Sequence, residues 1–132
     1  MNHQKWILSC AAAGALIASI QTTSAHHSLA AEFDVDTMIE ITGTITEMRW
    51  TNPHAWLHVD VQDADGNVEN WAVEFASPNS LYRRGWSKAD LPVGATVNII
   101  GYAPRDNSRV TSATEVTLPD GRRLFAGTRQ EE

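Results

Sequence analysis

Cysteine is almost absent from this chain. The one cysteine, Cys10, lies in an apolar segment near the amino terminus, and none follows it. If that segment is removed, the remaining domain has no disulfide, no thiolate metal ligand and no thiol nucleophile. Its core must then be stable without covalent cross-links.

Long hydrophobic runs are also lacking, except at the amino terminus. The uncharged run Trp6–Ile20 follows Lys5 and precedes small and polar residues that end at Ala25. Its 15 residues are too few to cross a membrane core that needs about 20, whereas this order of segments is typical of a secretory signal peptide. We expect residues 1–25 to be a cleaved signal peptide. The mature protein would begin at His26, be periplasmic or secreted, and keep no stable membrane anchor.

Positive charge is scarce. The chain has 10 basic and 16 acidic residues, and cleavage would also remove Lys5, which leaves a formal charge of −7. An acidic surface repels phosphate backbones and anionic lipids. The composition therefore predicts that nucleic acid is not a partner.

Recognisable catalytic motifs are missing. No serine lies in a Gly-x-Ser-x-Gly sequence, and the acidic residues form no evident acid and base pair. We expect Glu40, Glu47, Glu69 and Glu74 to lie on solvated strand faces. The sequence predicts that the protein is not an enzyme.

Helical periodicity is rare after residue 38, where β-branched and polar residues alternate, as is typical of strands. Gly43 suggests a bulge in the first strand. Asp65-Gly66 predicts a hairpin, and Ser77 followed by Pro78 predicts one short helix that ends near Gly85. The expected strands span residues 39–46, 55–63, 68–75, 96–102, 110–118 and 122–125.

The order of these elements predicts an all-β fold. Three strands, a short helix, two strands and a small additional strand match the oligonucleotide/oligosaccharide-binding (OB) barrel. We expect an OB-like barrel of five to six strands at residues 39–127, with the helix between strands 3 and 4. A small open β-sandwich is the alternative. Residues 26–38 form an N-terminal segment, and residues 128–132 a disordered tail.

Several motifs of the mature chain look familiar in combination. They are AHHS at residues 25–28, WTNPH at residues 50–54, and DGR at residues 120–122 followed by FAG at residues 125–127. Together they resemble a family of small exported bacterial proteins known only as a domain of unknown function. The resemblance implies export and a compact β-rich domain, and it supplies no catalytic residues.

The four mature histidines fall in two groups, His26 with His27 and His54 with His58. The amine and imidazole of an amino-terminal His26 can chelate one ion, and a further imidazole from His54 or His58 would complete a T-shaped site suited to Cu(II). A cut after Ser24 would instead place a histidine third, where two backbone amides complete a square-planar Cu(II) or Ni(II) site. Copper is therefore the candidate cofactor. The alternative is that these histidines are ordinary polar residues.

Tryptophans and polar residues suggest a second kind of site. Trp71 shares a strand face with Val73 and Phe75 and is expected in the core, whereas Trp56 should face outward. An exposed aromatic face can stack on a glycan or seat an envelope protein. The alternative is that flanking segments cover this face. The candidate ligand-binding residues are Trp50, Asn52, Trp56, Arg84 and Trp86.

The sequence thus predicts a non-enzymatic binding or accessory protein, with Cu(II) as the ligand or, alternatively, a glycan or envelope protein. Both the compartment and the copper chelate depend on cleavage. We predict that intact-mass measurement of the exported protein gives the mass of residues 26–132. Recovery of exported protein that still carries Met1 would contradict this.

Overall fold

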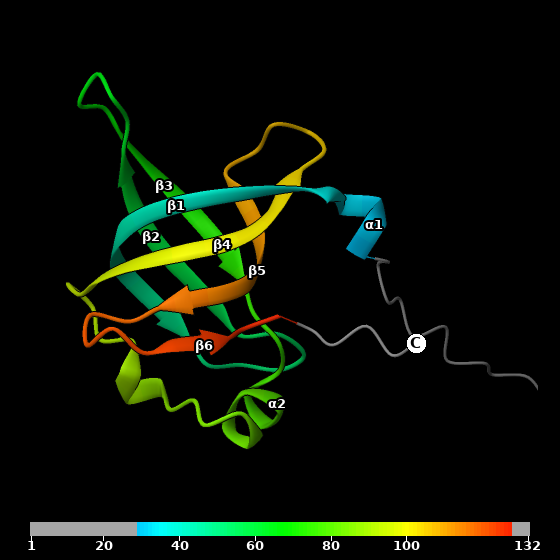
Figure 1. Ribbon diagram of the computed structural model, residues 1–132, viewed down its shortest axis with the longest axis vertical. Helices are drawn as coiled ribbons and strands as arrows, with labels where there is room; N and C mark the ends of the chain where they lie inside the picture. Colours follow the sequence, from blue (N-terminus) through cyan, green and yellow to red (C-terminus); the bar gives the residue numbers. More distant parts are fainter. Residues whose placement is uncertain (1–28, 128–132) are drawn as a thin grey trace, which may run out of the picture.

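The first strand is the longest element and joins the two halves of the barrel (Figure 1). In the computed structural model, which describes residues 29–127, β1 spans Phe33–Arg49. Its first half pairs antiparallel with β4 (Thr96–Pro104), and its second half pairs antiparallel with β2 (Trp56–Gln62). β1 therefore connects strands that are distant in the sequence.

The barrel closes through the remaining strands. β3 (Val68–Glu74) pairs antiparallel with β2 and parallel with the start of β5 (Val110–Thr117), and β6 (Arg123–Phe125) extends the sheet beyond β5. The strand order is β3-β2-β1-β4-β5-β6, with the additional pairing β3–β5. This closed topology is that of the OB barrel, so the predicted fold class is confirmed.

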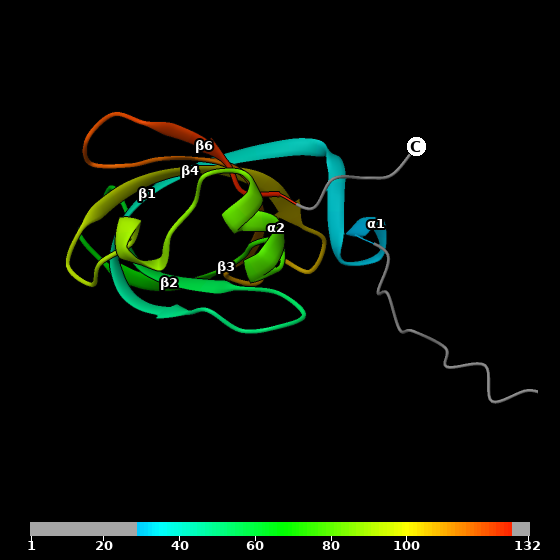
Figure 2. The ribbon, with the colours of Figure 1, turned by 90° about the horizontal axis from the view of Figure 1, so that it is seen from below.

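Short helices lie outside the sheet. α2 (Pro78–Arg83) connects β3 to β4, and seen from below it lies across one end of the barrel (Figure 2). Ser77 caps it by accepting a hydrogen bond from the Ser80 N–H, and Gly85 follows with a positive φ of 89°, as the sequence predicts. Two single turns were not expected, namely α1 (Leu29–Glu32) and the 3-10 turn η1 (Lys88–Asp90).

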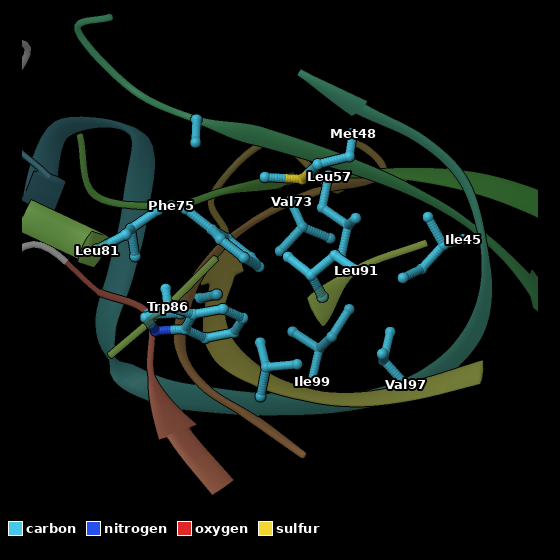
Figure 3. Packing of buried hydrophobic residues seen from close by; sticks show 14 of the residues in the cluster. Ile45, Met48, Leu57, Val73, Phe75, Leu81, Trp86, Leu91, Val97 and Ile99 are labelled. Carbon is cyan, nitrogen blue, oxygen red and sulfur yellow. The ribbon is translucent and has the colours of Figure 1, made fainter. Parts of the chain in front are cut away.

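The hydrophobic core fills the barrel and continues under α2 (Figure 3). Alternate residues of the strands point inward, and Leu81 of α2 is fully buried against them. The Trp86 ring lies 5.5 Å from the Phe75 ring and closes this end of the core. The labelled side chains are Ile45, Met48, Leu57, Val73, Phe75, Leu81, Trp86, Leu91, Val97 and Ile99.

Two features of β1 differ from expectation. The strand begins at Phe33 rather than Ile39, because Phe33 pairs with Pro104. The pairing with β4 is irregular between Asp34 and Met38, where the Asp34 carboxylate accepts hydrogen bonds from the Asp36 N–H and the Thr37 hydroxyl. The irregular pairing expected at Gly43 lies between Ile45 and Glu47 instead. Gly43 is required for another reason, since a Cβ there would lie 2.9 Å from the Asp60 carbonyl oxygen.

The predicted signal peptide (1–25), residues 26–28 and the predicted tail (128–132) lie outside the described residues. In the part of the chain that the structure describes, no helix has the length and apolar character needed to span a membrane.

Close strand contact at Gly101 gives a test of the packing. A Cβ at Gly101 would collide with Thr111 Oγ1 and lie 2.6 Å from the Ser112 carbonyl oxygen. We expect Gly101→Ala to lower the free energy of unfolding by about 1–3 kcal/mol, as overpacking does. Thr96→Ala, at an exposed position of the same strand, should change it by less than about 0.5 kcal/mol. Urea denaturation measures both, and equal stability of the two variants would contradict the packing argument.

Candidate metal-binding site at His54

The loop between β1 and β2 places His54 beside the end of β3. Ala55, the residue after His54, donates its N–H to the Ala76 carbonyl at 3.2 Å and accepts from the Phe75 N–H at 2.9 Å. These two bonds extend the β2–β3 pairing beyond Trp56 and Glu74. The position of His54 is therefore fixed by backbone bonds on its carboxyl side.

The His54 ring is held by its Nδ1 atom. Nδ1 lies 3.0 Å from the Phe75 carbonyl oxygen and 3.2 Å from Glu74 Oε1. A carbonyl oxygen can only accept a hydrogen bond, so Nδ1 carries the hydrogen and the neutral ring has its lone pair on Nε2. Metal-binding histidines show this arrangement, in which one nitrogen donates to a carbonyl or carboxylate and the other binds the ion.

Glu74 supplies the carboxylate of this arrangement. Its side chain is 17% exposed, against 33% for His54. Burial raises the pKa of Glu74, the positive charge of a protonated His54 lowers it, and the negative charge of Glu32 raises it further.

His58 lies elsewhere. It is half-buried on the outer face of β2, across from Glu47 on β1 and Ala72 on β3. Among residues 29–127, no group of three or more His, Cys, Asp and Glu side chains could hold a metal ion. The other two predicted ligands, His26 and His27, lie outside the described residues.

Three of the predicted ligand-binding residues lie in or beside the β1–β2 loop. Asn52 is exposed, and Trp56 is half-buried on the outer face of β2. Trp50 packs edge-on against Tyr82 of α2, with ring centroids 5.4 Å apart. Its indole N–H is buried and has no acceptor among the described residues.

The other two predicted ligand-binding residues, Trp86 and Arg84, make contacts with other residues of the domain. Trp86 is 2% exposed and donates its indole N–H to the Phe125 carbonyl oxygen at 2.9 Å, so the prediction that it contacts a ligand at the surface is wrong. Its ring instead packs against the Phe75 ring in the core. Arg84 donates to the Gly127 carbonyl oxygen, and its guanidinium lies 4.8 Å from the centre of the Phe125 ring. The five residues therefore do not form one aromatic face.

Sequence reasoning missed the partners of His54. Strand alternation placed Glu74 correctly on an outward face, but an outward face was taken to be solvated. The pattern of side chains cannot predict that the backbone carbonyl of Phe75 is a partner of His54. The sequence contained one indication of this contact. Glu74 and Phe75 end a strand that pairs with the strand directly after the loop that contains His54.

A family model for a family of unknown function, DUF6152, matches residues 13–113. The chain belongs to this family, which confirms the coarse part of the resemblance. A comparison with curated proteins finds no match.

Solved structures similar to this chain include the mitochondrial single-stranded DNA binding protein of S. cerevisiae. Its two crystal forms have 14% and 12% sequence identity and TM-scores of 0.47, and cover 70% and 71% of this chain and 96% and 98% of their own. The N-terminal domain of the PriB protein from Thermoanaerobacter tencongensis has 15% identity and a TM-score of 0.42, and covers 63% of this chain and 96% of its own.

This comparison contradicts the prediction that nucleic acid is not a partner, because two of these similar structures are of a protein that binds single-stranded DNA. The prediction used net charge, which sums over the whole molecule and does not describe any one face. At these identities the likeness concerns the fold alone. The exclusion of nucleic acid is therefore withdrawn.

The raised pKa of Glu74 predicts how stability depends on pH. The folded protein keeps the Glu74 proton at pH values where the unfolded chain has lost it, so this contribution is complete below the usual value of 4.5 and is lost as pH rises through the raised pKa. Between about pH 4 and about pH 8, we expect wild type to lose stability relative to Glu74→Gln. Urea denaturation of the metal-free proteins measures this. Parallel stability curves for the two proteins would contradict it.

Proposed function

We propose that this protein is an exported, non-enzymatic copper-binding or accessory protein. Signal peptidase removes residues 1–25, and the new terminus binds Cu(II) through the amine and imidazole of His26. His54 Nε2 supplies the third nitrogen. The observation that carries this proposal is the donation of His54 Nδ1–H to the Phe75 carbonyl oxygen, which leaves Nε2 as the nitrogen that can bind an ion.

The position of α1 supports the choice of His54 over His58. Glu32, at the end of α1, interacts electrostatically with Glu74, and Glu74 lies 3.2 Å from His54 Nδ1. Two residues lie between His26 and Leu29, and the three steps from one to the other span at most about 10 Å when the chain is extended. In both views of the molecule, α1 and the β1–β2 loop lie toward the same end (Figures 1 and 2).

The chemistry of the donors fits copper. Two imidazoles and an amine are neutral nitrogen ligands, which favour Cu(II) in a tetragonal arrangement. Glu74 is not counted as a ligand here. It supports the His54 ring and increases the basicity of Nε2, as carboxylates behind metal-binding histidines do.

The structure gives less support to the alternative, a site for a glycan or an envelope protein. Trp56 remains on the outer face of β2, but Trp86 lies in the core and Trp50 packs against Tyr82. A continuous aromatic surface for such a partner is therefore not formed by the predicted residues.

Copper titration of the processed protein tests the proposal. We expect His54→Ala to weaken Cu(II) binding by at least about tenfold. Loss of a group that only hydrogen-bonds to a metal ligand already weakens metal binding by about that factor, and loss of the ligand itself should weaken it at least as much. The electron paramagnetic resonance (EPR) spectrum should also lose the contribution of one nitrogen. His58→Ala is the matched control and should bind like wild type.

A second arm tests the amino terminus. Acetylation of the His26 amine should abolish the wild-type spectrum, because the amine can then no longer bind the ion. Equal affinity of His54→Ala and wild type, or unchanged binding after acetylation, would overturn the proposal.

A further inference from the structure

Residues 125–127, at the end of β6, are bound through their backbone like a peptide in a groove. Each of their three carbonyl oxygens accepts a hydrogen bond from the segment at residues 76–86. The pairs are Phe125 with the Trp86 indole N–H, Ala126 with the Ala76 N–H, and Gly127 with the Arg84 guanidinium. From the β5 side, the Thr114 carbonyl oxygen accepts from the Ala126 N–H at 3.0 Å. Peptides that add to a sheet edge are held by main-chain hydrogen bonds of this kind.

The side chains of the segment fit this groove closely. Leu124 is half-buried and packs against the core, and Ala126 is fully buried. At Gly127 an added Cβ would lie 2.9 Å from the Ala113 carbonyl oxygen. The groove therefore selects a small residue followed by glycine. A second copy of this chain carries that sequence and can make every one of these contacts.

The connection between β5 and β6 can open at low cost. β6 has three residues, is the last strand in the sheet order and pairs with β5. Residues 119–121, which form the turn between them, are all exposed. Opening this turn uncovers no side chain of its own. Arg122 follows the turn and moves with β6, so its ion pair with Asp90 can also form between two copies.

We propose that β6 exchanges between two copies of this chain, so that residues 122–127 of each copy occupy the groove of the other. Release of the strand alone would lose its hydrogen bonds and expose Ala126, whereas exchange restores both. Such exchange of an identical element is a low-cost route to dimers. A segment on a short linker has an effective concentration of about 1 mM. Exchanged dimers should therefore compete with the monomer as the protein concentration approaches about 1 mM.

The turn offers a variant that favours exchange. Gly121 has a φ of 85° and no atom within 4 Å of an added Cβ, so a larger residue there is opposed by backbone strain alone. A β-branched residue adopts this φ only with strain, and an open hinge relieves it in both copies. We expect Gly121→Val to lower the dissociation constant of the dimer at least about tenfold. Light scattering after size-exclusion chromatography over a range of concentrations measures this.

Gly66→Val is the matched control. Gly66 lies in the turn between β2 and β3, where its φ of 88° is close to that of Gly121, and an added Cβ there meets its nearest atom at 3.7 Å. The strain is similar, but this turn stays closed when β6 exchanges. Gly66→Val should lose stability and keep the wild-type dissociation constant.

Disulfide cross-linking identifies the exchanged strand. Residues 26–132 contain no cysteine, and Thr117 of β5 lies opposite Arg123 of β6, at a separation that a disulfide can span. Thr117→Cys and Arg123→Cys proteins are mixed at about 1 mM, incubated and oxidised. Exchange places one cysteine of each protein opposite the other. We therefore expect the disulfide-linked heterodimer to exceed the two homodimers combined at least about tenfold by mass spectrometry.

A second mixture controls for random collision. Val68→Cys, on the β2–β3 hairpin, replaces Thr117→Cys in it. Val68 is 61% exposed and pairs with Gln62 rather than with β6. Its heterodimer with Arg123→Cys should only equal the two homodimers combined.

The outcomes decide the inference without involving copper, because all measurements use metal-free protein. A monomer at every concentration for both wild type and Gly121→Val would overturn it. So would a dimer without enrichment of the heterodimer between Thr117→Cys and Arg123→Cys, since the copies would then associate through another surface. Should Gly121→Val not fold, the cross-linking result decides, because that pair leaves the turn unchanged. Either failure leaves the proposed function standing.

Discussion

The parallel pairing of β3 with β5 is the interaction on which the rest of the structure depends. It places Ala72 beside Val110 and Glu74 beside Ser112, and the Ala72 N–H donates to the Arg109 carbonyl oxygen at 2.9 Å. This pairing converts an open sheet into a barrel. It also places the end of β3, which carries Glu74, beside the start of β5, which directly follows the β4–β5 loop.

The candidate site lies where the pairing of β2 with β3 ends. His54 comes from the β1–β2 loop and Glu74 from the end of β3, and this pairing brings His54 Nδ1 to 3.2 Å from Glu74 Oε1. Each part has a separate physical task. The carbonyl of Phe75 sets the tautomer of His54, and the half-buried carboxylate of Glu74 lies beside the ring.

Much of the fold could be predicted from the sequence because its signals are local. Alternation located five strands to within a few residues, and Ser77, Pro78 and Gly85 located α2. The start of β1 at Phe33 could not be predicted, because its pairing with Pro104 joins residues far apart in the chain and Thr37 and Met38 interrupt the alternation. The sequence also identified His54 as a candidate ligand. Its carbonyl partner and the partial burial of Glu74 could not be predicted, because both depend on tertiary structure.

The length of β1 also affects the order in which the chain can acquire its structure. Phe33 to Thr44 pair with residues 96–104, which are made more than 50 residues later. During synthesis β2 and β3 can therefore pair early, whereas the first half of β1 stays unpaired until residues 96–104 of β4 have been made. Contacts of such large sequence separation slow folding and leave an unpaired edge open to association with other chains. The acidic residues Asp34, Asp36 and Glu40 on that half of the strand are of the kind that discourages such association.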